Sequence, residues 1–513
     1  LRDATISADI VSQEELGREG FDVEPYRDAD VILIDESHNF RNNTANRSGM
    51  LTEVITRNGG RGRAGERKKI ILLTATPINN DLFDLHNQIA LMTQGDRAHF
   101  AGAGIGDLHK YFLRARRESP HDGSGLALFN LLEEVVIRRT RQFVKQAYPN
   151  AVILKKQPDG STREMPVRFP QRRLRTEEYN LEATYQGIYD TVVSGIESLN
   201  LAPYNLETYK KKGVEVNEWE EGRQVALVGI FKSRYLKRFE SSVHAIRISV
   251  RRALEFQKTF ESYVLEGKVL KSSDFRKAMR FLEREDEEDD ATPPSRADEI
   301  DEHQEARQIA DELETVDPKD YDLRRLHDAV QHDIEALTRI WDVVKDIKPE
   351  QDAKLARFKE LLAGPLKGKK VLVFSYYRDT ERYLHRELAG DNNRAQAFLE
   401  TAGDPHIRRI DSGNHPEERK GIIAGFAPVA NNKPEIAGTD REIDVLISTD
   451  VLSEGQNLQD CAHMVNFDLH WNPCRMVQRA GRIARIGTPF DTLYIHNMFP
   501  DEGLERLLKI DER

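Results

Sequence analysis

The chain has 513 residues, of which 39% are hydrophobic and 32% are charged. This balance is typical of a soluble globular protein with room for about three domains. No apolar run approaches the roughly 20 residues needed to cross a bilayer, which excludes a membrane protein. The two cysteines, Cys461 and Cys474, are too far apart to form a CxxC pair. We therefore expect a cytoplasmic, reducing environment and no structural zinc.

The net charge of −11 is distributed unevenly along the chain. Residues 283–305 hold twelve acidic residues and two arginines, so the remainder of the chain is close to neutral. We expect this acidic segment to be a solvated loop or a disordered linker. Basic clusters such as "RGRAGERKK", 61–69, occur elsewhere. The net charge therefore does not exclude a nucleic acid as a partner.

The chain is divided by its hydrophobic patterns into three blocks. In residues 1–145, short apolar runs alternate with mixed segments, which predicts a parallel α/β arrangement. In residues 146–350, β-like runs are absent and helical spacing dominates; an apolar stripe with helical spacing runs through 233–260. In residues 351–513, β-like runs such as "KKVLVFSYY" return. The predicted fold class is α/β, with two parallel-sheet lobes separated by a large helical insertion.

The first stretch with a chemical signature is "VILIDESHNFRN", 31–42. Four apolar residues predict a strand, and Asp35 and Glu36 follow directly at its carboxyl end. Ligands of open α/β sheets bind at that edge. One carboxylate there can hold Mg²⁺ while its neighbour activates a water molecule. For a lone Asp-Glu pair, a solvated strand end is the simpler interpretation.

The next stretch, "LLTATP" at 72–77, is a second apolar run that ends in a turn rich in hydroxyl groups. Thr74 and Thr76 could connect a nucleotide site to a second site through hydrogen bonds. Taken alone, the pattern indicates only a strand followed by a turn that contains proline.

The segment 445–473 begins with an apolar run that ends at Ser448, Thr449 and Asp450. A turn containing Gly455 follows. Backbone amides and small hydroxyl groups in such a turn can bind a nucleic-acid phosphate without reading the base sequence.

The last stretch, "VQRAGRIARIG" at 477–487, carries Gln478, Arg479, Arg482 and Arg485. Spacing of three residues predicts that Arg482 and Arg485 share one helix face. Guanidinium groups that reach a phosphate across a cleft stabilise the charge of phosphoryl transfer. The alternative is a basic amphipathic helix without a catalytic role.

These stretches together resemble motifs II to VI of superfamily-two helicases, in the correct order. The resemblance depends on "DESH", "LLTATP", "VLVFSYYRDT", "STDVLSEGQNLQ", "DLHWNP" and "QRAGRIARIG". The Trp-Asn-Pro and Arg-Ile-Gly elements resemble the Swi/Snf branch. Within that branch the chain is most similar to bacterial RNA-polymerase-associated ATPases and to helicases linked to phospholipase-D-like nucleases. The resemblance covers about residues 1–145 and 365–500, and it implies RecA-like lobes, the first of them incomplete.

For the nucleotide, the resemblance implies ATP and Mg²⁺ as cofactors, with Asp35 as the Mg²⁺ ligand and Glu36 as the general base. Arg482 and Arg485 would be arginine fingers, and Gln478 would position the γ-phosphate or its water. The loop between the lobes that contacts the cofactor would contain Gly455, Gln456 and Asn457.

For the nucleic acid, the resemblance implies double-stranded DNA as the partner. Ser375 and Tyr376 would contact its backbone, with Thr449 and Asp450 beside them. The residues that couple hydrolysis to DNA contact would be His38, Thr74 and Thr76. Trp471 fits either a packed aromatic residue or a ligand contact.

Such an ATPase also needs the phosphate-binding sequence GxxxxGK[ST] ahead of the acidic pair. No such sequence precedes residue 35, and "GPLKGKK" at 364–370 has only three residues between its glycines. We therefore expect the chain to be a C-terminal part of a longer protein. The isolated chain should then show near-background ATP hydrolysis.

The favoured prediction is an ATP-driven translocase on duplex DNA, in phage defence or in chromosome or transcription maintenance. A non-catalytic clamp for DNA or polymerase and an RNA helicase remain open as alternatives. The helical insertion or the acidic segment would recruit any protein partner.

Overall fold

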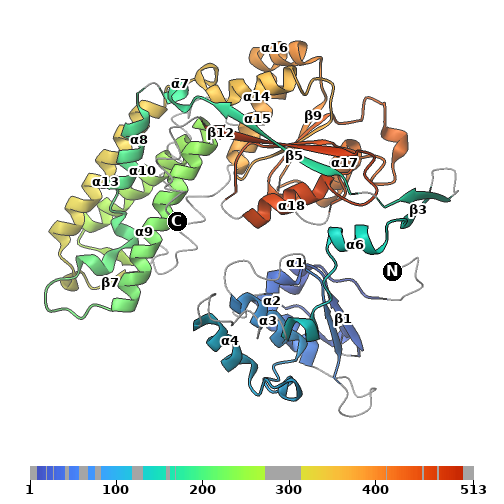
Figure 1. Ribbon diagram of the computed structural model, residues 1–513. Coiled ribbons are helices and arrows are strands. Elements are labelled where there is room, and N and C mark those ends of the chain that lie inside the picture. The colour runs from blue at the N-terminus through green and yellow to red at the C-terminus, as the bar shows by residue number, and fades with distance from the viewer. Residues whose placement is uncertain are drawn as a thin grey trace. The chain divides into compact units, whose positions relative to one another are not determined.

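The structure is a computed structural model in which the chain forms two compact units, Leu1–Pro149 and Asn150–Arg513. Figure 1 shows the helices and strands of both units. The acidic segment 283–305 lies outside the described residues. The described residues are 8–18, 20–26, 28–40, 46–56, 67–74, 82–117, 131–156, 162–167, 169–185, 187–271, 314–411, 413–452, 456–470 and 473–500.

The first unit contains a pair of parallel strands, β1 (Val31–Ile34) and β2 (Lys69–Leu72), with Ile34 opposite Leu72. Both strands match apolar runs in the sequence. Because they are parallel and in register, the residues that follow them emerge at the same edge. The helices of this unit are α1 (Gln13–Leu16), α2 (Asn46–Thr56), α3 (Leu82–Met92), α4 (Leu108–Arg117) and α6 (Arg141–Ala147).

Two small hydrophobic clusters support the first unit. One joins Ile34 at the end of β1 to Phe40 and to Ile55 of α2. The other joins Ile89 of α3 to Phe112 of α4. The first cluster lies directly beneath the chain that leaves β1, and so it fixes the position of the acidic pair.

The second unit is built on a six-stranded sheet with the order β5-β12-β11-β8-β10-β9, in which every neighbouring pair is parallel. The central strands β8 and β10 are buried throughout, as expected for parallel strands covered on both faces. The predicted α/β fold class is confirmed. The strands are β5 (Gln171–Tyr179), β8 (Val371–Phe374), β9 (Ile407–Ile410), β10 (Val445–Ser448), β11 (His463–Asn466) and β12 (Thr492–Pro500).

Helices cover both faces of this sheet. In Figure 1, α14, α15 and α16 lie on one side and α17 and α18 on the other. Val373 belongs to the cluster on the first side, whereas its neighbour Phe374 belongs to the cluster on the second. These helices are α14 (Ala353–Ala363), α15 (Arg378–Ala389), α16 (Asn393–Ala402), α17 (Pro416–Phe426) and α18 (Pro473–Ile483).

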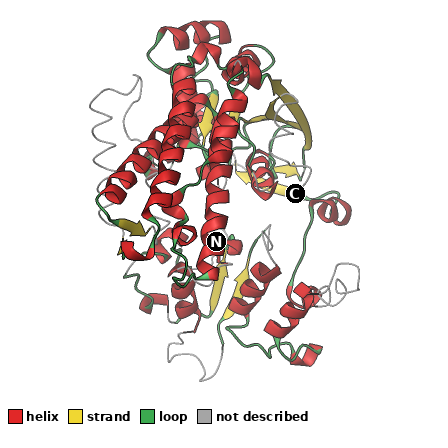
Figure 2. Cartoon of the chain, turned by 90° about the vertical axis from the view of Figure 1, so that its left-hand side faces the viewer, coloured by secondary structure: helices red, strands yellow, loops and turns green. Residues whose placement is uncertain are grey.

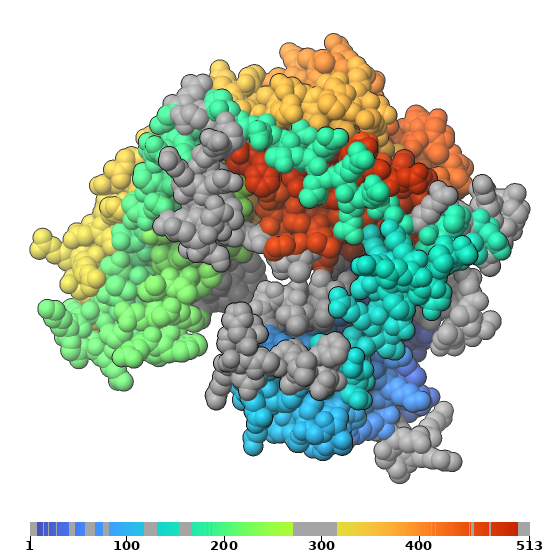
Figure 3. All heavy atoms as spheres, viewed as in Figure 1, coloured from blue at the N-terminus to red at the C-terminus, as the bar shows by residue number. Residues whose placement is uncertain are grey.

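Strand β5 corrects the expectation that residues 146–350 contain no strands. It pairs with β12 over nine residues, from Gln171 with Thr492 to Tyr179 with Pro500. In the space-filling view its teal atoms lie along the red atoms of the C-terminal strand (Figure 3). Two antiparallel pairs also occur in this block: β3 (Val152–Lys156) with β4 (Thr162–Pro166), and β6 (Val269–Lys271) with β7 (Glu314–Val316).

The helical insertion is a bundle of long helices that run side by side (Figure 2). The predicted stripe in 233–260 is buried, but the segment forms two helices, because Ser242 ends one and caps the next. Its hydroxyl accepts a hydrogen bond from the Ala245 amide at 3.0 Å, a standard N-cap. The helices of this region are α7 (Leu181–Tyr185), α8 (Tyr189–Ser198), α9 (Glu218–Ser241), α10 (Val243–Leu265) and α13 (Leu323–Val344).

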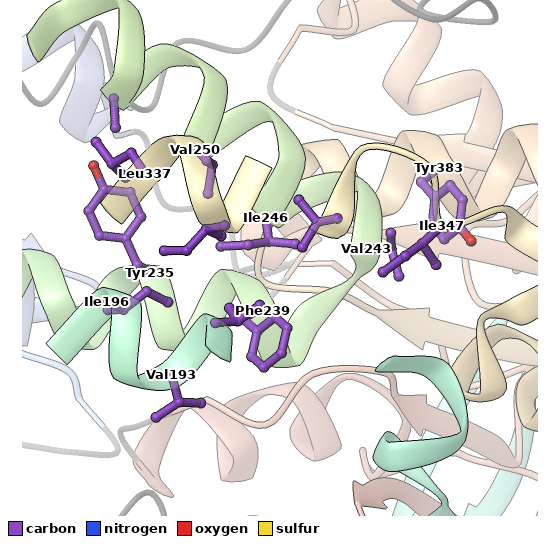
Figure 4. Packing of buried hydrophobic residues seen from close by; sticks show 14 of the residues in the cluster. Val193, Ile196, Tyr235, Phe239, Val243, Ile246, Val250, Leu337, Ile347 and Tyr383 are labelled. Atoms are coloured by element: carbon purple, nitrogen blue, oxygen red, sulfur yellow. The ribbon is translucent and has the colours of Figure 1, made fainter. Parts of the chain in front are cut away.

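The bundle shares one hydrophobic core with the lobe that follows it. Figure 4 shows Val243 of α10, Ile347 and Tyr383 of α15 together in this core. Each fully buried aliphatic or aromatic side chain contributes about 1.5–3 kcal/mol. The insertion and the lobe are therefore joined by apolar burial within a single compact unit.

Short 3₁₀ helices complete the described structure, and none of its helices is both long and apolar enough to cross a membrane. The 3₁₀ helices are Glu24–Tyr26, Ser37–Phe40, Ala101–Ala103, Ala202–Tyr204, Leu206–Tyr209, Pro318–Asp320, Pro349–Gln351, Pro434–Ile436 and Asp450–Leu452.

Candidate functional site

In the first unit, the acidic pair follows β1 directly. Asp35 is exposed and Glu36 is half-buried. The Asp35 carboxylate accepts a hydrogen bond from the Glu36 amide at 3.0 Å, and its carbonyl accepts one from the Gln13 side chain at 2.9 Å. These bonds hold the backbone at the end of the strand while the carboxylate of Asp35 faces solvent.

Glu36 has a left-handed backbone conformation, with φ of 49°. A residue with a side chain adopts this conformation only where its surroundings enforce it. Here the Ser37 amide donates to the Leu73 carbonyl at 2.9 Å, and the Leu73 amide donates to the Ile34 carbonyl at 2.8 Å. The sharp turn after β1 is thus bonded to the end of β2, and it turns the Glu36 side chain toward His38.

His38 lies between the two strand ends. It is buried, and its Nδ1 is 3.3 Å from Glu36 Oε2 and 3.2 Å from Thr74 Oγ1. Glu36 follows β1 and Thr74 follows β2. One imidazole therefore connects the carboxylate to the hydroxyl group at the neighbouring strand end. The coupling of hydrolysis to DNA contact through His38 and Thr74 stays a prediction.

The donor set at this edge suits Mg²⁺. The described residues contain no group of three or more His, Cys, Asp or Glu side chains that could hold a metal. Mg²⁺ is commonly bound through one or two carboxylates, water and substrate phosphates rather than through an all-protein cage. The exposed oxygen ligand of Asp35 fits that mode of binding.

In the second unit, the loop 456–459 is bonded to the end of α18. Arg485 donates to the side-chain oxygen of Asn457. The Leu458 amide donates to the Arg482 carbonyl at 3.3 Å, and the Gln459 side chain donates to the Ile486 carbonyl at 3.1 Å. The loop 456–459 and the arginine segment, which the sequence assigned to two separate motifs, are thus held together by hydrogen bonds.

The expectation that Arg482 and Arg485 share a helix face is wrong. Helix α18 ends at Ile483, so Arg482 is in the last turn and Arg485 lies two residues beyond the helix. The bond from Leu458 to the Arg482 carbonyl binds that last turn to the neighbouring loop. Arg482 is buried and Arg485 is half-buried, so the two side chains have different surroundings.

The structure also reveals a residue whose role the sequence did not assign. Arg479 is fully buried, and its guanidinium binds the Asp450 carboxylate through two bonds, of 2.6 and 3.0 Å. It also donates to the Asp468 carbonyl at 3.0 Å and lies over the Phe374 ring. Arg479 therefore holds α18 against the carboxyl ends of β8, β10 and β11, next to Gln478. The sequence gave no sign that Arg479 is buried, because it lies in a basic helix.

The predicted nucleic-acid residues lie at the same edge of the sheet. The Ser375 hydroxyl is buried and donates to Asp468 Oδ2 at 2.5 Å, whereas Tyr376 is 41% exposed. The Tyr376 ring packs edge-on against His470, with the centroids 5.1 Å apart. The prediction of a DNA contact therefore depends more on Tyr376 than on Ser375. Thr449 and Asp450 are half-buried at the end of β10.

The buried carboxylate of Asp468 anchors this edge. Burial raises its pKa, but the Lys354 ammonium and the bonds from Ser375 and Tyr376 outweigh that effect, so its pKa lies below the ordinary value. Asp468 is therefore ionised at neutral pH.

In the first unit the structure thus brings Asp35, Glu36, His38 and Thr74 together. In the second unit it bonds Asn457 to Arg485, and it places Ser375, Tyr376, Thr449 and Asp450 at the ends of the paired strands β8 and β10. Gln478 is half-buried on α18, where it accepts a hydrogen bond from Arg475 at 3.4 Å. Gln456 is half-buried beside Asn457. The remaining predicted residues lie outside the described residues: Thr76, Gly455 and Trp471.

Comparison with known proteins matches the second unit to a helicase domain. Residues 353–487, from α14 to the end of the arginine segment, match the model of the helicase conserved C-terminal domain. Over 144 residues the chain is 34% identical to an uncharacterized ATP-dependent helicase, YqhH, of Bacillus subtilis (strain 168). That stretch is 28% of this chain and 21% of the relative, so the chain spans about a fifth of the relative's length.

Among solved structures, the chain is similar to the crystal structure of the C-terminal part of the Fun30 ATPase domain. The similarity covers 67% of this chain and 89% of the other, with 15% sequence identity and a TM-score of 0.31. The family match thus identifies residues 353–487 of the second unit as similar to the C-terminal domain of helicases.

Proposed function

We propose that the chain is part of an ATP-driven motor of the Swi/Snf branch of superfamily-two helicases that moves along duplex DNA. The observation that carries the proposal is the contact of His38 with both Glu36 and Thr74. This contact gives a carboxylate at one strand end a direct connection to the neighbouring strand end. A hydrolase that must transmit its chemical step to a second site needs such a connection.

In the proposed reaction, Glu36 accepts a proton from the water that attacks the γ-phosphate, and Asp35 holds Mg²⁺. Bound Mg²⁺ supplies charge neutralisation on the phosphate oxygens. His38 limits the orientations of the Glu36 carboxylate through its 3.3 Å contact. A base held in this way needs less reorganisation to reach the attacking water.

In the same reaction, Arg485 and Arg482 supply positive charge to the transferring phosphoryl group. The bond to Asn457 restrains the Arg485 side chain. Arginine fingers of this kind contribute about 10³–10⁵ in turnover. Gln478, on the same helix as Arg482, positions the γ-phosphate or its water.

Duplex DNA is proposed to lie along the carboxyl edge of the second unit's sheet, where Tyr376 is exposed. Contacts from a loop to phosphates set the register without reading the sequence. Repeated cycles of ATP binding and hydrolysis would then advance the motor along one strand. We propose phage defence or chromosome or transcription maintenance as its setting.

The test is ATP hydrolysis by the protein that the complete gene encodes, measured without nucleic acid and with duplex DNA, single-stranded DNA or RNA. The proposal expects duplex DNA to give the largest stimulation. Stimulation by RNA alone would favour an RNA helicase. ATP hydrolysis that no nucleic acid stimulates would overturn the translocase proposal.

A further inference from the structure

The corner between α9 and α10 is bonded to the first turn of α15. Arg238, near the end of α9, forms a buried ion pair with Asp379. The hydroxyl of Thr380 lies 2.6 Å from that of Ser241 and 2.8 Å from that of Ser242. The insertion therefore contacts the helix that starts immediately after Tyr376 and Tyr377.

A buried lysine lies at the same corner. Lys354 of α14 is only 4% exposed, and its Nζ donates to the carbonyls of Glu240 at 2.9 Å and Ser241 at 3.2 Å. These are the last two carbonyls of α9, where a cation interacts favourably with the helix dipole. The ammonium also lies 4.4 Å from the centre of the Phe467 ring. Lys354 therefore caps the carboxyl end of an insertion helix from within the lobe.

The same ammonium reaches the loop that carries Tyr376 through one carboxylate. Lys354 Nζ lies 3.4 Å from Asp468 Oδ1, and both side chains are buried. The other oxygen of Asp468 accepts the Tyr376 amide at 2.9 Å and the Ser375 hydroxyl. Two side chains, those of Lys354 and Asp468, thus connect the end of α9 to the backbone of Tyr376.

We propose that Lys354 is a positioning residue that links the end of α9 to the Tyr376 loop through Asp468. A shift of α9 in the insertion is transmitted to the loop, and a shift of the loop is transmitted to α9. The role of that loop in binding DNA rests on the proposed function. The mechanical link itself rests only on the contacts around Lys354.

The chemistry of this site explains why a lysine stands there. Its ammonium has three donors for the two carbonyls and the carboxylate. Removal of the charge leaves Asp468 buried without its cation, which is costly for a buried ion pair. Loss of the Lys354 ammonium should therefore increase the mobility of both the end of α9 and the Tyr376 loop.

The first test is amide hydrogen exchange in the full chain for Lys354→Met, Lys354→Arg and the control Lys369→Met, whose lysine is exposed. In Lys354→Met, segments 236–243 and 375–380 should both exchange at least about fivefold faster. Lys354→Arg should restore both segments, and Lys369→Met should leave both unchanged. Should Lys354→Met not fold, Lys354→Gln, which keeps a donor without the charge, is measured in the same way.

Faster exchange at 236–243 with wild-type exchange at 375–380 would overturn the proposal, because Lys354 would then be only a local helix cap. Unchanged exchange in both segments would overturn it as well. This readout requires no DNA, so it tests the link even if the proposed function fails.

The second test is duplex binding and DNA-stimulated ATP hydrolysis by the protein from the complete gene. Lys354→Met should raise the DNA concentration for half-maximal stimulation about tenfold, while turnover at saturating DNA stays within about twofold. An equal loss of both parameters would point to general instability and contradict the positioning role. If the wild-type protein itself does not bind duplex DNA, the proposed function fails and the exchange result still decides the link.

Discussion

Arg479 and Asp450 are 29 residues apart in the sequence and form a two-bond ion pair beneath the carboxyl edge of the second unit's sheet. The arginine is fully buried, whereas the aspartate side chain is 23% exposed. The pair joins the end of β10 to α18. The ion pair therefore fixes the position of α18, the helix that leads into the predicted arginine fingers.

The ion pair predicts a large effect of Asp450→Asn on stability. The substitution leaves a buried guanidinium with only neutral acceptors, so unfolding of the second unit should become easier by about 3 kcal/mol. Calorimetry of the whole chain measures this shift, and Asp440→Asn at an exposed site is the matched control. A change no larger than that of the control would show that the pair contributes little.

Arg485→Gln tests the arginine-finger role. The substitution keeps a donor for Asn457 but removes the charge, so turnover of DNA-stimulated ATP hydrolysis should fall about 10³-fold. Steady-state kinetics of the protein from the complete gene provide the measurement. Arg441→Gln, at an exposed position in the same unit, should behave as wild type. Wild-type turnover in Arg485→Gln would assign Arg485 a purely structural bond to Asn457.

Glu381 predicts a pH dependence of stability. Burial raises the pKa of this carboxyl from 4.5 to about 8, although nearby Arg409 acts in the opposite direction. The folded chain then keeps a proton that the unfolded chain releases as the pH rises above 4.5. The stability that Glu381 contributes is therefore full below about pH 4.5 and is lost as the pH rises toward 8.

The test compares melting temperatures across this pH range for wild type, Glu381→Gln and the exposed control Glu400→Gln. Glutamine carries no titrating proton, so Glu381→Gln should gain stability relative to wild type as the pH increases. Parallel curves for wild type and Glu381→Gln would contradict the raised pKa.

Glu177 should hold the edge strand β5 in place. Its carboxylate accepts from His496 of β12 and from Arg357 of α14, each at 2.8 Å. Glu177→Ala should accelerate amide exchange across 171–179, while Glu178→Ala, next to it and exposed, should not. Equal exchange in the two variants would show that backbone pairing with β12 alone is sufficient to hold the strand.

The sequence predicted the elements with strong hydrophobic patterns. The apolar runs at β1, β2, β8 and β10 are strands, and the stripe that contains Phe239 and Ile246 is buried. The side chains of β8 and β10 are buried throughout, so there the local pattern and the final environment agree. In β1 and β2 the pattern predicted the strands but not their burial, because Val31, Leu33 and Ile71 are exposed.

The sequence did not predict β5, because "QRRLRTEEY" has almost no apolar residues. It lies at the edge of the sheet, where most of its side chains are exposed and only Glu177 and Tyr179 are buried. Its pairing with β12 depends on contacts across more than three hundred residues. Periodicity within a window cannot detect such contacts.

Three local features of the second unit were also missed, for different reasons. The break at Ser242 carried a capping signal that helix-start rules recognise. The end of α18 before Arg485 carried no such signal, because the bond from Leu458 to Arg482 forms only in the folded unit. The burial of Arg479 likewise depends on the strand ends around it.

If Glu36 activates the water that attacks ATP, Glu36→Gln should slow the chemical step itself, and single-turnover hydrolysis measures that step. The protein is the product of the complete gene, and Glu15→Gln at an exposed site is the control. The hydrolysis rate of Glu36→Gln should fall at least about 100-fold, with ATP and DNA still bound. Hydrolysis at the wild-type rate in Glu36→Gln would show that Glu36 is not the base.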